Sequence, residues 1–484
     1  MVIIMQNEAK NTGTDEYGVD ILLVWPSISN CFTIDAPSMG LAYLAAVLEP
    51  HYSVKVLECQ TEKVYEPEAV LEYIKNTKPR VLGFSLPTLS MPHTEVIVES
   101  LIKQESRPIL IAGGPHPTVL PAETLEIGFD YIAIGEAEET LTELMALIYN
   151  KPDAKKLEDI DGLAFKKDGQ VIKTNKRKLL DVNELPFPAW HFFKVDNYSG
   201  YVRKRDRCLP IMGGRGCPEN CTFCYKGVFG TSLRVRRPEL VVDEIQYLKD
   251  NFNIEEFVIL DENFTLKKAH VIEFCNLLLE REINLPWFLG SGVRVDAAEE
   301  EIVALMKKAG CYRASLGVES GNEEILKEYK KRINKNQVRE AVALYKKYGY
   351  EVTLFFLIGA PSDTRETIKE TIDFAIELDP DIVQFNAVMP FPGTALFDYY
   401  DSKGLLITKD WKDYNIFDPD CEPVYTHQNL SHDELKELRS KAYRAFYFRF
   451  GYFIKQIKNI RSFSDVSLLL KKTFIFLGFM KSKI

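Results

Sequence analysis

Short apolar runs alternate with amphipathic segments along the first 150 residues of the chain. The run DILLVWPS at 20–27 has the length and the terminal Pro-Ser of a buried strand. The segment EPEAVLEYIKNTK at 66–78 carries its acids early and its lysines late, as the dipole of a helix favours. The same alternation predicts strands at 20–27, 53–59, 79–87 and 107–117, helices at 40–49, 66–78 and 92–104, and a strand followed by a helix within 129–148. This order is typical of a parallel, doubly wound α/β sheet.

Ligands of such sheets bind at the carboxyl ends of the strands. The residues that fall there are Ser85, Gly113 with Gly114, and Gly135 with Glu136. We therefore expect a binding site of the first domain to be built around these positions.

The alternation resumes at about residue 208. Strands are predicted at 208–216, 255–265, 286–295, 312–321, 351–361 and 381–394, and helices at 238–252, 268–282, 299–310, 334–349 and 364–379. Six such units, the last ending loosely, predict a partial (β/α) barrel. Polar or glycine-rich residues recur at the strand ends, where barrels place their active sites.

These patterns divide the chain into five parts. We expect a disordered leader at 1–18, an α/β domain at 19–150, a connector at 151–200, a barrel at 201–400 and a helical C-terminal region at 401–484. The connector is charged and punctuated by proline, and it includes a hairpin at 162–174 around Asp168-Gly169.

Composition and charge narrow the class of protein. The formal net charge of −10 excludes a general nucleic-acid binder. The chain begins without the basic segment and long apolar core of a secretory signal, and no apolar run approaches the ~20 residues of a membrane span. Nine cysteines without a disulfide spacing predict reduced thiols with metal or catalytic roles.

Three of these cysteines, Cys217, Cys221 and Cys224, share the stretch GGRGCPENCTFCYKG at 213–227. A structural zinc site needs a fourth ligand, usually from a second cysteine pair, and the chain has no second C-x2-C. Thiolates on one glycine-rich loop are typical ligands of an iron–sulfur cluster. Three ligands for a four-iron cluster leave one iron open to a substrate or cofactor.

The CxxxCxxC loop after the first strand of a six-unit barrel, with the aromatic Phe223 before the third cysteine, resembles the radical S-adenosylmethionine (SAM) superfamily. The resemblance implies a [4Fe-4S] cluster held by Cys217, Cys221 and Cys224. It also implies that the open iron binds SAM, which is cleaved to a 5′-deoxyadenosyl radical.

Other strand ends resemble SAM-contacting segments of the same superfamily. LDENF resembles the segment that meets the methionine amino group, which implies Asp261 or Glu262. SLGVESG resembles the ribose and carboxylate contact, which implies Glu319 and Ser320. FFLIGAPSDTRET resembles the motif beside adenine, which implies Ile358 and Gly359. The alternative for each acid is a strand-end carboxylate that caps the following helix.

The first domain resembles the cobalamin-binding domain that precedes the barrel in one large class of this superfamily, the class B methyltransferase-like enzymes. The resemblance rests on MGLAYLAAVLE at 39–49, GFSLPT at 83–88, GGPHPTVLP at 113–121 and IGEAEETL at 134–141. It implies a flavodoxin- or Rossmann-like fold and a pocket for the nucleotide tail at Ser85, Gly113 and Gly114. Glu136 and His116 are further candidates for contact with cobalamin.

The chain departs from one cobalamin motif. DAPSMGLAYLA, at 35–45, lacks the histidine that ligates cobalt in many cobalamin proteins. We therefore expect base-off cobalamin without a histidine ligand. The alternative for the whole domain is a flavodoxin-like module that binds no corrin.

The C-terminal segment has a composition of its own. Residues 439–484 hold 11 Lys and Arg against one acid, Asp465, together with 11 aromatic residues. Three interpretations remain open: helices packed on the barrel, contact with an anionic membrane surface, or RNA binding through cations and stacking aromatics.

The combined resemblance predicts a cobalamin-dependent radical SAM enzyme that methylates an unactivated C–H bond of a small molecule, lipid or natural product. Alternatives are cyclisation, rearrangement or C–C coupling of a tetrapyrrole or lipid, and a non-enzymatic corrin or iron–sulfur carrier. We expect an external electron donor of the flavodoxin or ferredoxin type. The expected location is the cytoplasm, with peripheral membrane contact through the basic tail and no nucleic-acid partner.

Overall fold

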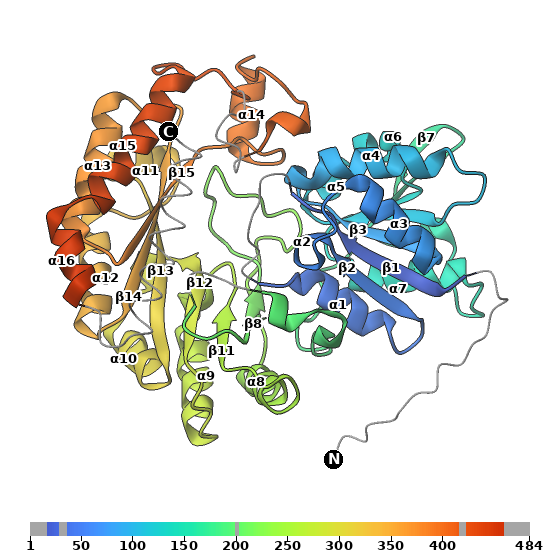
Figure 1. The fold of residues 1–484 in the computed structure, drawn as a ribbon, viewed down its shortest axis with the longest axis horizontal. Helices are drawn as coiled ribbons and strands as arrows, with labels where there is room; N and C mark the ends of the chain where they lie inside the picture. The colour runs from blue at the N-terminus through green and yellow to red at the C-terminus, as the bar shows by residue number, and fades with distance from the viewer. Residues whose placement is uncertain (1–16, 29–35, 199–202, 416–422, 459–484) are drawn as a thin grey trace. The chain divides into compact units, whose positions relative to one another are not determined.

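A computed structural model describes residues 17–28, 36–198, 203–415 and 423–458 (Figure 1). The chain forms two compact units, one of Met1–Leu180 with Glu184–Tyr198 and one of Asp181–Asn183 with Ser199–Ile484. The predicted leader, apart from Tyr17 and Gly18, and the last 26 residues of the predicted tail lie outside the described residues.

The first unit is built on a seven-stranded sheet of order β2-β1-β3-β4-β5-β6-β7. Its strands are β1 (Val19–Trp25), β2 (Val54–Glu58), β3 (Pro79–Ser85), β4 (Ile109–Gly113), β5 (Tyr131–Ala133), β6 (Leu163–Lys167) and β7 (Gln170–Lys173). The first five strands are parallel, as the alternation predicts. The expected hairpin forms between β6 and β7, and β6 pairs antiparallel with β5, so the hairpin extends this sheet.

Helices cover both faces of the sheet, which gives the doubly wound arrangement. They are α1 (Met39–Leu48), α2 (Cys59–Glu62), α3 (Pro67–Thr77), α4 (Met91–Ile102), α5 (Pro115–Val119), α6 (Pro121–Ile127) and α7 (Glu138–Ile148). Helix α1 packs beside α7, and α3 packs beside α4 on the other face (Figure 1). Strand β2 is added on one side of β1, and β3, β4 and β5 are added on the other side. The topological switch point therefore lies between β1 and β3, and folds of this type bind ligands at such a point.

The second unit is built on six parallel strands of order β15-β14-β13-β12-β11-β8. They are β8 (Cys208–Ile211), β11 (Glu256–Ile259), β12 (Trp287–Val293), β13 (Cys311–Glu319), β14 (Glu351–Ile358) and β15 (Ile382–Ala387). Five intervening helices are α8 (Pro238–Phe252), α9 (Lys268–Glu280), α10 (Glu300–Lys308), α12 (Lys335–Lys347) and α13 (Arg365–Leu378). These are the six units predicted for the partial barrel.

The two faces of β11 show how side chains are sorted in this unit. Phe257 stacks on Trp287, which meets Phe274 of α9 edge to face, so this side of the strand faces the helices. Val258 packs instead with Phe288 and Tyr312 of the next two strands, inside the barrel. Because successive side chains of a strand alternate between its faces, odd positions of β11 face α9 and even positions face the interior.

The open edge of the barrel is strand β15, and helix α15 (His432–Tyr447) covers it. The Tyr447 hydroxyl accepts a hydrogen bond from the Val383 N–H at 3.0 Å and donates one to the Val383 carbonyl at 2.8 Å. The Tyr443 hydroxyl accepts one from the Phe385 N–H at 3.1 Å. Two tyrosines therefore supply the hydrogen bonds that a further strand would make.

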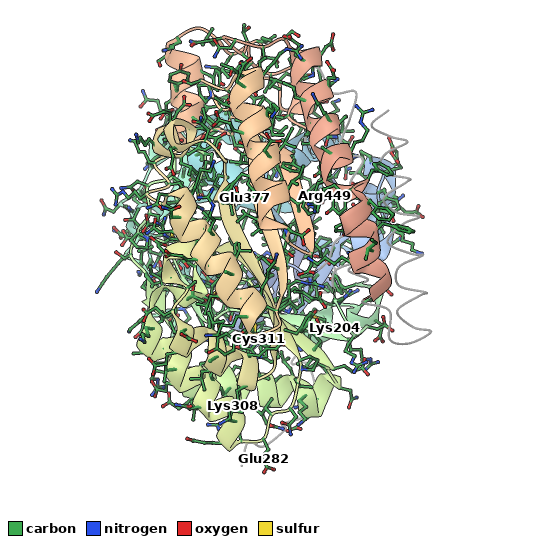
Figure 2. The ribbon with its side chains drawn as sticks, turned by 90° about the vertical axis from the view of Figure 1, so that its left-hand side faces the viewer. Lys204, Glu282, Lys308, Cys311, Glu377 and Arg449 are labelled. Atoms are coloured by element: carbon green, nitrogen blue, oxygen red, sulfur yellow. The ribbon has the colours of Figure 1, made fainter. Side chains whose placement is uncertain are left out.

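Helix α16 (Phe450–Lys458) follows α15, and Figure 2 shows the outer helices with Glu377 on α13 and Arg449 between α15 and α16. The described part of this region therefore packs on the barrel, which confirms the packing interpretation for residues 439–458. Within the described ranges, no helix combines the length and apolarity needed to traverse a bilayer.

Candidate active site

The three-cysteine loop leaves the barrel between two short strands, β9 (Gly214–Arg215) and β10 (Arg234–Val235), which pair antiparallel at its base. The Arg236 N–H donates to the Gly213 carbonyl at 2.8 Å, which extends this closure by one residue. Gly216 has φ of +87°, and a Cβ there would lie 2.4 Å from the Ser232 carbonyl oxygen. Only glycine fits this bend, so the loop conformation depends on it.

The thiols of the loop are accessible from the carboxyl end of the barrel. Cys217 and Cys221 are partly buried, and Cys224 is exposed. Burial raises the pKa of the Cys221 and Cys224 thiols, and the neighbouring cations Lys331 and Lys226 act against this rise. No three His, Cys, Asp or Glu side chains in the described ranges converge as metal ligands. Ligation by the three cysteines therefore stays a prediction.

The two acids of LDENF have different surroundings. The Asp261 Oδ1 accepts a hydrogen bond from the Gly213 N–H at 2.7 Å, and burial raises the pKa of this carboxyl to about 8. Glu262 accepts one from the Gly216 N–H at 3.2 Å. Both acids lie beyond the end of β11 at Ile259, where Asp261 is buried and Glu262 is exposed. Glu262 is thus the more accessible of the two candidates.

The fourth strand ends on a buried ion pair. Lys331 Nζ donates to Glu319 Oε1 at 2.8 Å, and both side chains are almost completely buried. A Cβ at Gly317 would lie 2.7 Å from Glu319 Oε1, so glycine makes room for the pair. Glu319 itself has φ of +71°, a left-handed conformation that non-glycine residues rarely adopt and that clusters at functional sites.

Arg294 joins this pair to the cysteine loop. Its guanidinium contacts Glu219 of the loop at 3.1 Å and donates to the Lys331 carbonyl at 2.9 Å. Asp296 holds its other side at 2.7 Å. Arg294 and Lys331 thus place two cations beside Cys221, with which both interact electrostatically.

The remaining SAM candidates lie at the ends of β13 and β14. The Ser320 hydroxyl lies 3.1 Å from that of Thr371 and accepts from the Asn322 N–H, so it supports the turn into the next helix. Ile358 is buried at the end of β14. Gly359 has φ of +103°, and its N–H donates to Asp363 at 2.9 Å.

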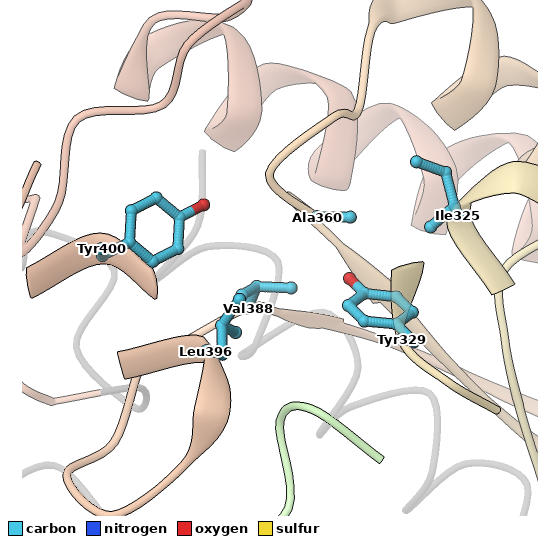
Figure 3. Packing of buried hydrophobic residues seen from close by; sticks show 6 residues of the cluster. All are labelled: Ile325, Tyr329, Ala360, Val388, Leu396 and Tyr400. Carbon is cyan, nitrogen blue, oxygen red and sulfur yellow. The ribbon is translucent and has the colours of Figure 1, made fainter. Parts of the chain in front are cut away.

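An apolar cluster beside Gly359 was not anticipated from the sequence. Its buried members are Ile325, Tyr329, Ala360, Val388, Leu396 and Tyr400 (Figure 3). Phe223 of the cysteine loop packs against it, edge to face on Tyr329 with ring centroids 5.2 Å apart. The Thr222 N–H donates to the Tyr329 carbonyl, and the Leu396 N–H donates to the Thr222 carbonyl. No described residue hydrogen-bonds the buried hydroxyls of Tyr329 and Tyr400.

A second unanticipated feature is the ion pair between Arg236 and Glu244, whose side chains are 1% and 0% exposed and 2.6 Å apart. The Arg236 guanidinium also donates to the Met212 carbonyl at 3.0 Å. The apolar periodicity of α8 includes Glu244 at a buried position, and a carboxylate there signals a buried cationic partner. Only the fold shows that this partner precedes the helix at Arg236.

The candidates of the first unit meet at neighbouring strand ends. Ser85 of β3 and Gly113 of β4 are paired in register. A Cβ at Gly114, where φ is +96°, would lie 2.9 Å from the Leu86 nitrogen. The structure thus brings Ser85, Gly113 and Gly114 together at the carboxyl edge of the sheet, where the predicted strand ends place them.

His116 and Glu136 are buried near this edge. The His116 Nδ1 lies 3.2 Å from the Thr88 hydroxyl, and burial lowers the pKa of the ring to about 4. A Glu136 oxygen accepts a hydrogen bond from the Leu180 N–H at 3.2 Å. Contact of either side chain with cobalamin stays a prediction.

The residues present suit the groups that the sequence predicts. Three thiols on one loop beside the cations Lys331 and Arg294 form a donor set for an anionic cluster with soft ligands. Small residues lie at neighbouring strand ends of the first unit, on the edge of the sheet where doubly wound folds bind ligands.

Comparison with known proteins agrees with both assignments. Residues 211–375 match the model of the radical SAM superfamily, and residues 27–145 match that of the B12 binding domain. The first match contains the cysteine loop and the strand ends described above. The second contains Ser85, Gly113 and Gly114.

Similarity extends over most of the chain. The uncharacterized methyltransferase PH0819 of Pyrococcus horikoshii is 32% identical over 448 residues, which cover 90% of this chain and 94% of that protein. The anaerobic magnesium-protoporphyrin IX monomethyl ester cyclase of Rubrivivax gelatinosus is 27% identical, over 85% of this chain and 74% of the cyclase.

A solved structure shares the fold. The cobalamin-dependent SAM radical enzyme OxsB, with aqua-cobalamin and SAM bound, superimposes with a TM-score of 0.72 and 18% identity. The superposition covers 96% of this chain and 72% of OxsB. The chain therefore belongs to the radical SAM enzymes that carry a B12-binding domain.

Proposed function

We propose that this protein is a cobalamin-dependent radical SAM methyltransferase that acts on an unactivated C–H bond of a small-molecule, lipid or natural-product substrate. The observation that carries the proposal is the cysteine loop, which the ends of β8, β11 and β12 hold at the carboxyl edge of a parallel barrel. When bound, a [4Fe-4S] cluster with SAM supplies a carbon-centred radical, and cobalamin supplies a methyl group.

The chain's own residues have separate tasks in this proposal. Cys217, Cys221 and Cys224 hold the cluster, and Gly216 gives the loop its bend. Glu262, which is exposed beside the cysteine loop, and the Glu319–Lys331 pair are the charged groups offered to SAM.

The other candidates shape the rest of the site. Ile358 and Gly359 border the adenine position, beside the apolar cluster that contains Tyr329. Ser85, Gly113 and Gly114 form the edge proposed to receive cobalamin, base-off and without a histidine ligand. Reduction of the cluster needs one electron, for which we propose an external donor of the flavodoxin or ferredoxin type.

A second candidate function is oxidative cyclisation or rearrangement of a tetrapyrrole or lipid with the same cofactors. The 27% identity with a magnesium-protoporphyrin cyclase favours it, because the similarity covers 85% of this chain and 74% of the cyclase. The two candidates differ in the fate of the SAM methyl group.

The test is anaerobic reconstitution with iron, sulfide, cobalamin and a reductant, followed by incubation with methyl-deuterated SAM and a metabolite and lipid extract. We expect 5′-deoxyadenosine and a product that carries the deuterated methyl group. A product without the label identifies the cyclase-type reaction. Absence of 5′-deoxyadenosine in the wild-type reaction overturns both candidates.

Matched variants tie the result to the loop. Cys221→Ala abolishes the brown absorbance of the cluster and the 5′-deoxyadenosine, whereas Cys275→Ala, at a buried free cysteine of α9, keeps both. Equal behaviour of the two variants rules out the ligand assignment.

A further inference from the structure

The C-terminal helices present a fixed outer face. On their inner side, Arg449 contacts Asp379 at 2.9 Å, and Lys455 contacts Asp381 at 3.1 Å. The Tyr452 hydroxyl donates to the Asp381 carbonyl at 3.1 Å. Together with the tyrosines of α15 on β15, these contacts set which side of α16 faces the barrel.

The outer side of the same segment carries exposed phenylalanines. Phe448, Phe450 and Phe453 are 63%, 78% and 63% exposed, and within the described ranges no other large hydrophobic side chain is as exposed. All three fall within six residues, whereas the other exposed apolar side chains are scattered over the chain. A concentration of exposed apolar groups marks an interaction surface.

Two exposed cations share a helical face with the first of these phenylalanines. Lys441 and Arg444 are exposed, and they precede Phe448 by seven and four residues on α15, which places them on the same helical face. The nearby acids Asp379 and Asp381 are already engaged by Arg449 and Lys455. We call Lys441, Arg444, Phe448, Phe450 and Phe453 the aromatic–basic patch.

We propose that the aromatic–basic patch docks this protein on an anionic lipid surface. Phenylalanine rings enter the interface between headgroups and acyl chains, while lysine and arginine remain among the anionic headgroups. Residues 459–484 continue the composition in sequence, with five Lys and Arg, four Phe and one acid.

Charge favours an anionic surface as the occupant, and the exposed phenylalanine rings favour an anionic surface with an apolar layer, which is a lipid surface. The whole chain has a net charge of −10 although residues 439–484 are strongly basic. An anionic surface therefore repels most of the protein and attracts this region, which fixes the orientation of docking. A bilayer can also accept exposed rings directly, whereas a protein partner would need a groove complementary to them.

The test is cosedimentation of the full chain with vesicles of phosphatidylcholine containing either 30% or no phosphatidylglycerol (roughly physiological and zero anionic content). We expect binding to the anionic vesicles that weakens as salt rises. The triple variant Phe448→Ser, Phe450→Ser, Phe453→Ser binds at least ~10-fold more weakly, and so does Lys441→Glu, Arg444→Glu.

Matched controls are the triple variant Val96→Ser, Ile102→Ser, Ile407→Ser, at exposed apolar positions elsewhere, and the charge variant Lys75→Glu, Lys103→Glu. Both bind vesicles like wild type. Circular dichroism of each variant verifies that it is folded.

Three outcomes overturn the proposal. The first is that both patch variants bind vesicles as tightly as wild type does. The second is that the matched controls lose as much vesicle binding as the patch variants. The third is that the patch variants lose self-association, or binding to an RNA oligonucleotide, with no change in vesicle binding. These readouts need neither cofactors nor turnover, so they are independent of the proposed reaction.

Discussion

The carboxyl of Asp261 accepts a hydrogen bond of 2.7 Å from the backbone N–H of Gly213, four residues before the first loop cysteine. An acid from the strand-end motif thus holds the start of the cysteine loop, while its exposed neighbour Glu262 accepts a hydrogen bond from the Gly216 N–H of the same loop. The loop and the second barrel strand are one structural unit.

Replacing Asp261 by Ala should destabilise the loop, because the buried Gly213 N–H loses its acceptor. The expected cost is about 1–3 kcal/mol of unfolding free energy, with reduced iron retention after reconstitution. Asp261→Asn keeps an acceptor for this N–H. It also resembles the protonated carboxyl, since burial raises the pKa of Asp261 to about 8. Urea unfolding and iron analysis should separate the variants, and equal stability of the two would contradict this role.

The buried ion pair of Arg236 with Glu244 predicts a larger effect. Glu244→Ala removes the carboxylate partner of a buried guanidinium, at a cost of about 3–5 kcal/mol in urea unfolding. The double variant Arg236→Met, Glu244→Leu should recover much of this loss, since it removes both charges. A double variant less stable than Glu244→Ala would mean that the Arg236 contact with Met212 outweighs the pair.

Gly216→Ala should distort the loop, because its Cβ would lie 2.4 Å from a backbone carbonyl oxygen at a φ of +87°. We expect loss of most cluster absorbance after reconstitution. Gly349→Ala is the control: its φ is +70°, but no atom lies within 4 Å of the added Cβ. That variant suffers only the backbone cost of about 1 kcal/mol and should keep the cluster. Normal cluster content in Gly216→Ala would refute the steric argument.

Acid should weaken the second unit through His270. Burial lowers the pKa of this ring from 6.5 to about 4, and no described residue hydrogen-bonds either ring nitrogen. Between these pH values the unfolded chain binds a proton that the folded chain does not, so stability falls as pH decreases through this window. The full effect is about 3 kcal/mol.

Urea unfolding of wild type and His270→Leu at pH 7 and pH 5 measures this contribution. The variant should lose less stability on acidification than wild type. Burial also lowers the pKa of His116 to about 4, so this ring makes the stability of the first unit depend on pH in the same way. His116 is present in both proteins and does not contribute to the difference between them. An identical pH response of the two proteins would assign the acid sensitivity to other groups.

Removing the hydroxyls that cover β15 should expose its edge. In Tyr443→Phe, Tyr447→Phe the N–H groups of Val383 and Phe385 lose their acceptors. We expect each loss to cost about 1–3 kcal/mol and both amides to exchange hydrogen faster. Tyr399→Phe, which removes only an exposed contact with Lys403, serves as the control and should leave exchange unchanged.

Much of this fold could be predicted because its signals are local. Apolar runs and amphipathic segments defined all six barrel units, and a glycine marked the end of β4 at Gly113. The signal for the hairpin at 162–174 was also local. Its pairing with β5 could not be predicted, because this pairing depends on which strand forms the free edge of the folded sheet.

The site was less predictable because its contacts join distant parts of the chain. The sequence could not distinguish Asp261 from Glu262, since the burial of each and its contact with the cysteine loop arise only on folding. Arg236 and Glu244, and Phe223 and Tyr329, are partners only after folding. The aromatic composition of the tail was visible in the sequence. Its packed side could be told from its exposed side only after folding, from contacts such as those of Tyr443 and Tyr447 with β15.

The anchors of the cysteine loop also determine the order of assembly. They come from Asp261, from Arg294, from the Tyr329 carbonyl and from the Leu396 N–H, so the last anchor is synthesised long after the cysteines. The loop can make all four contacts only after the chain has been synthesised through Leu396. In small zinc domains the metal drives folding; for this chain we expect the polypeptide to form the scaffold before the metal centre is installed.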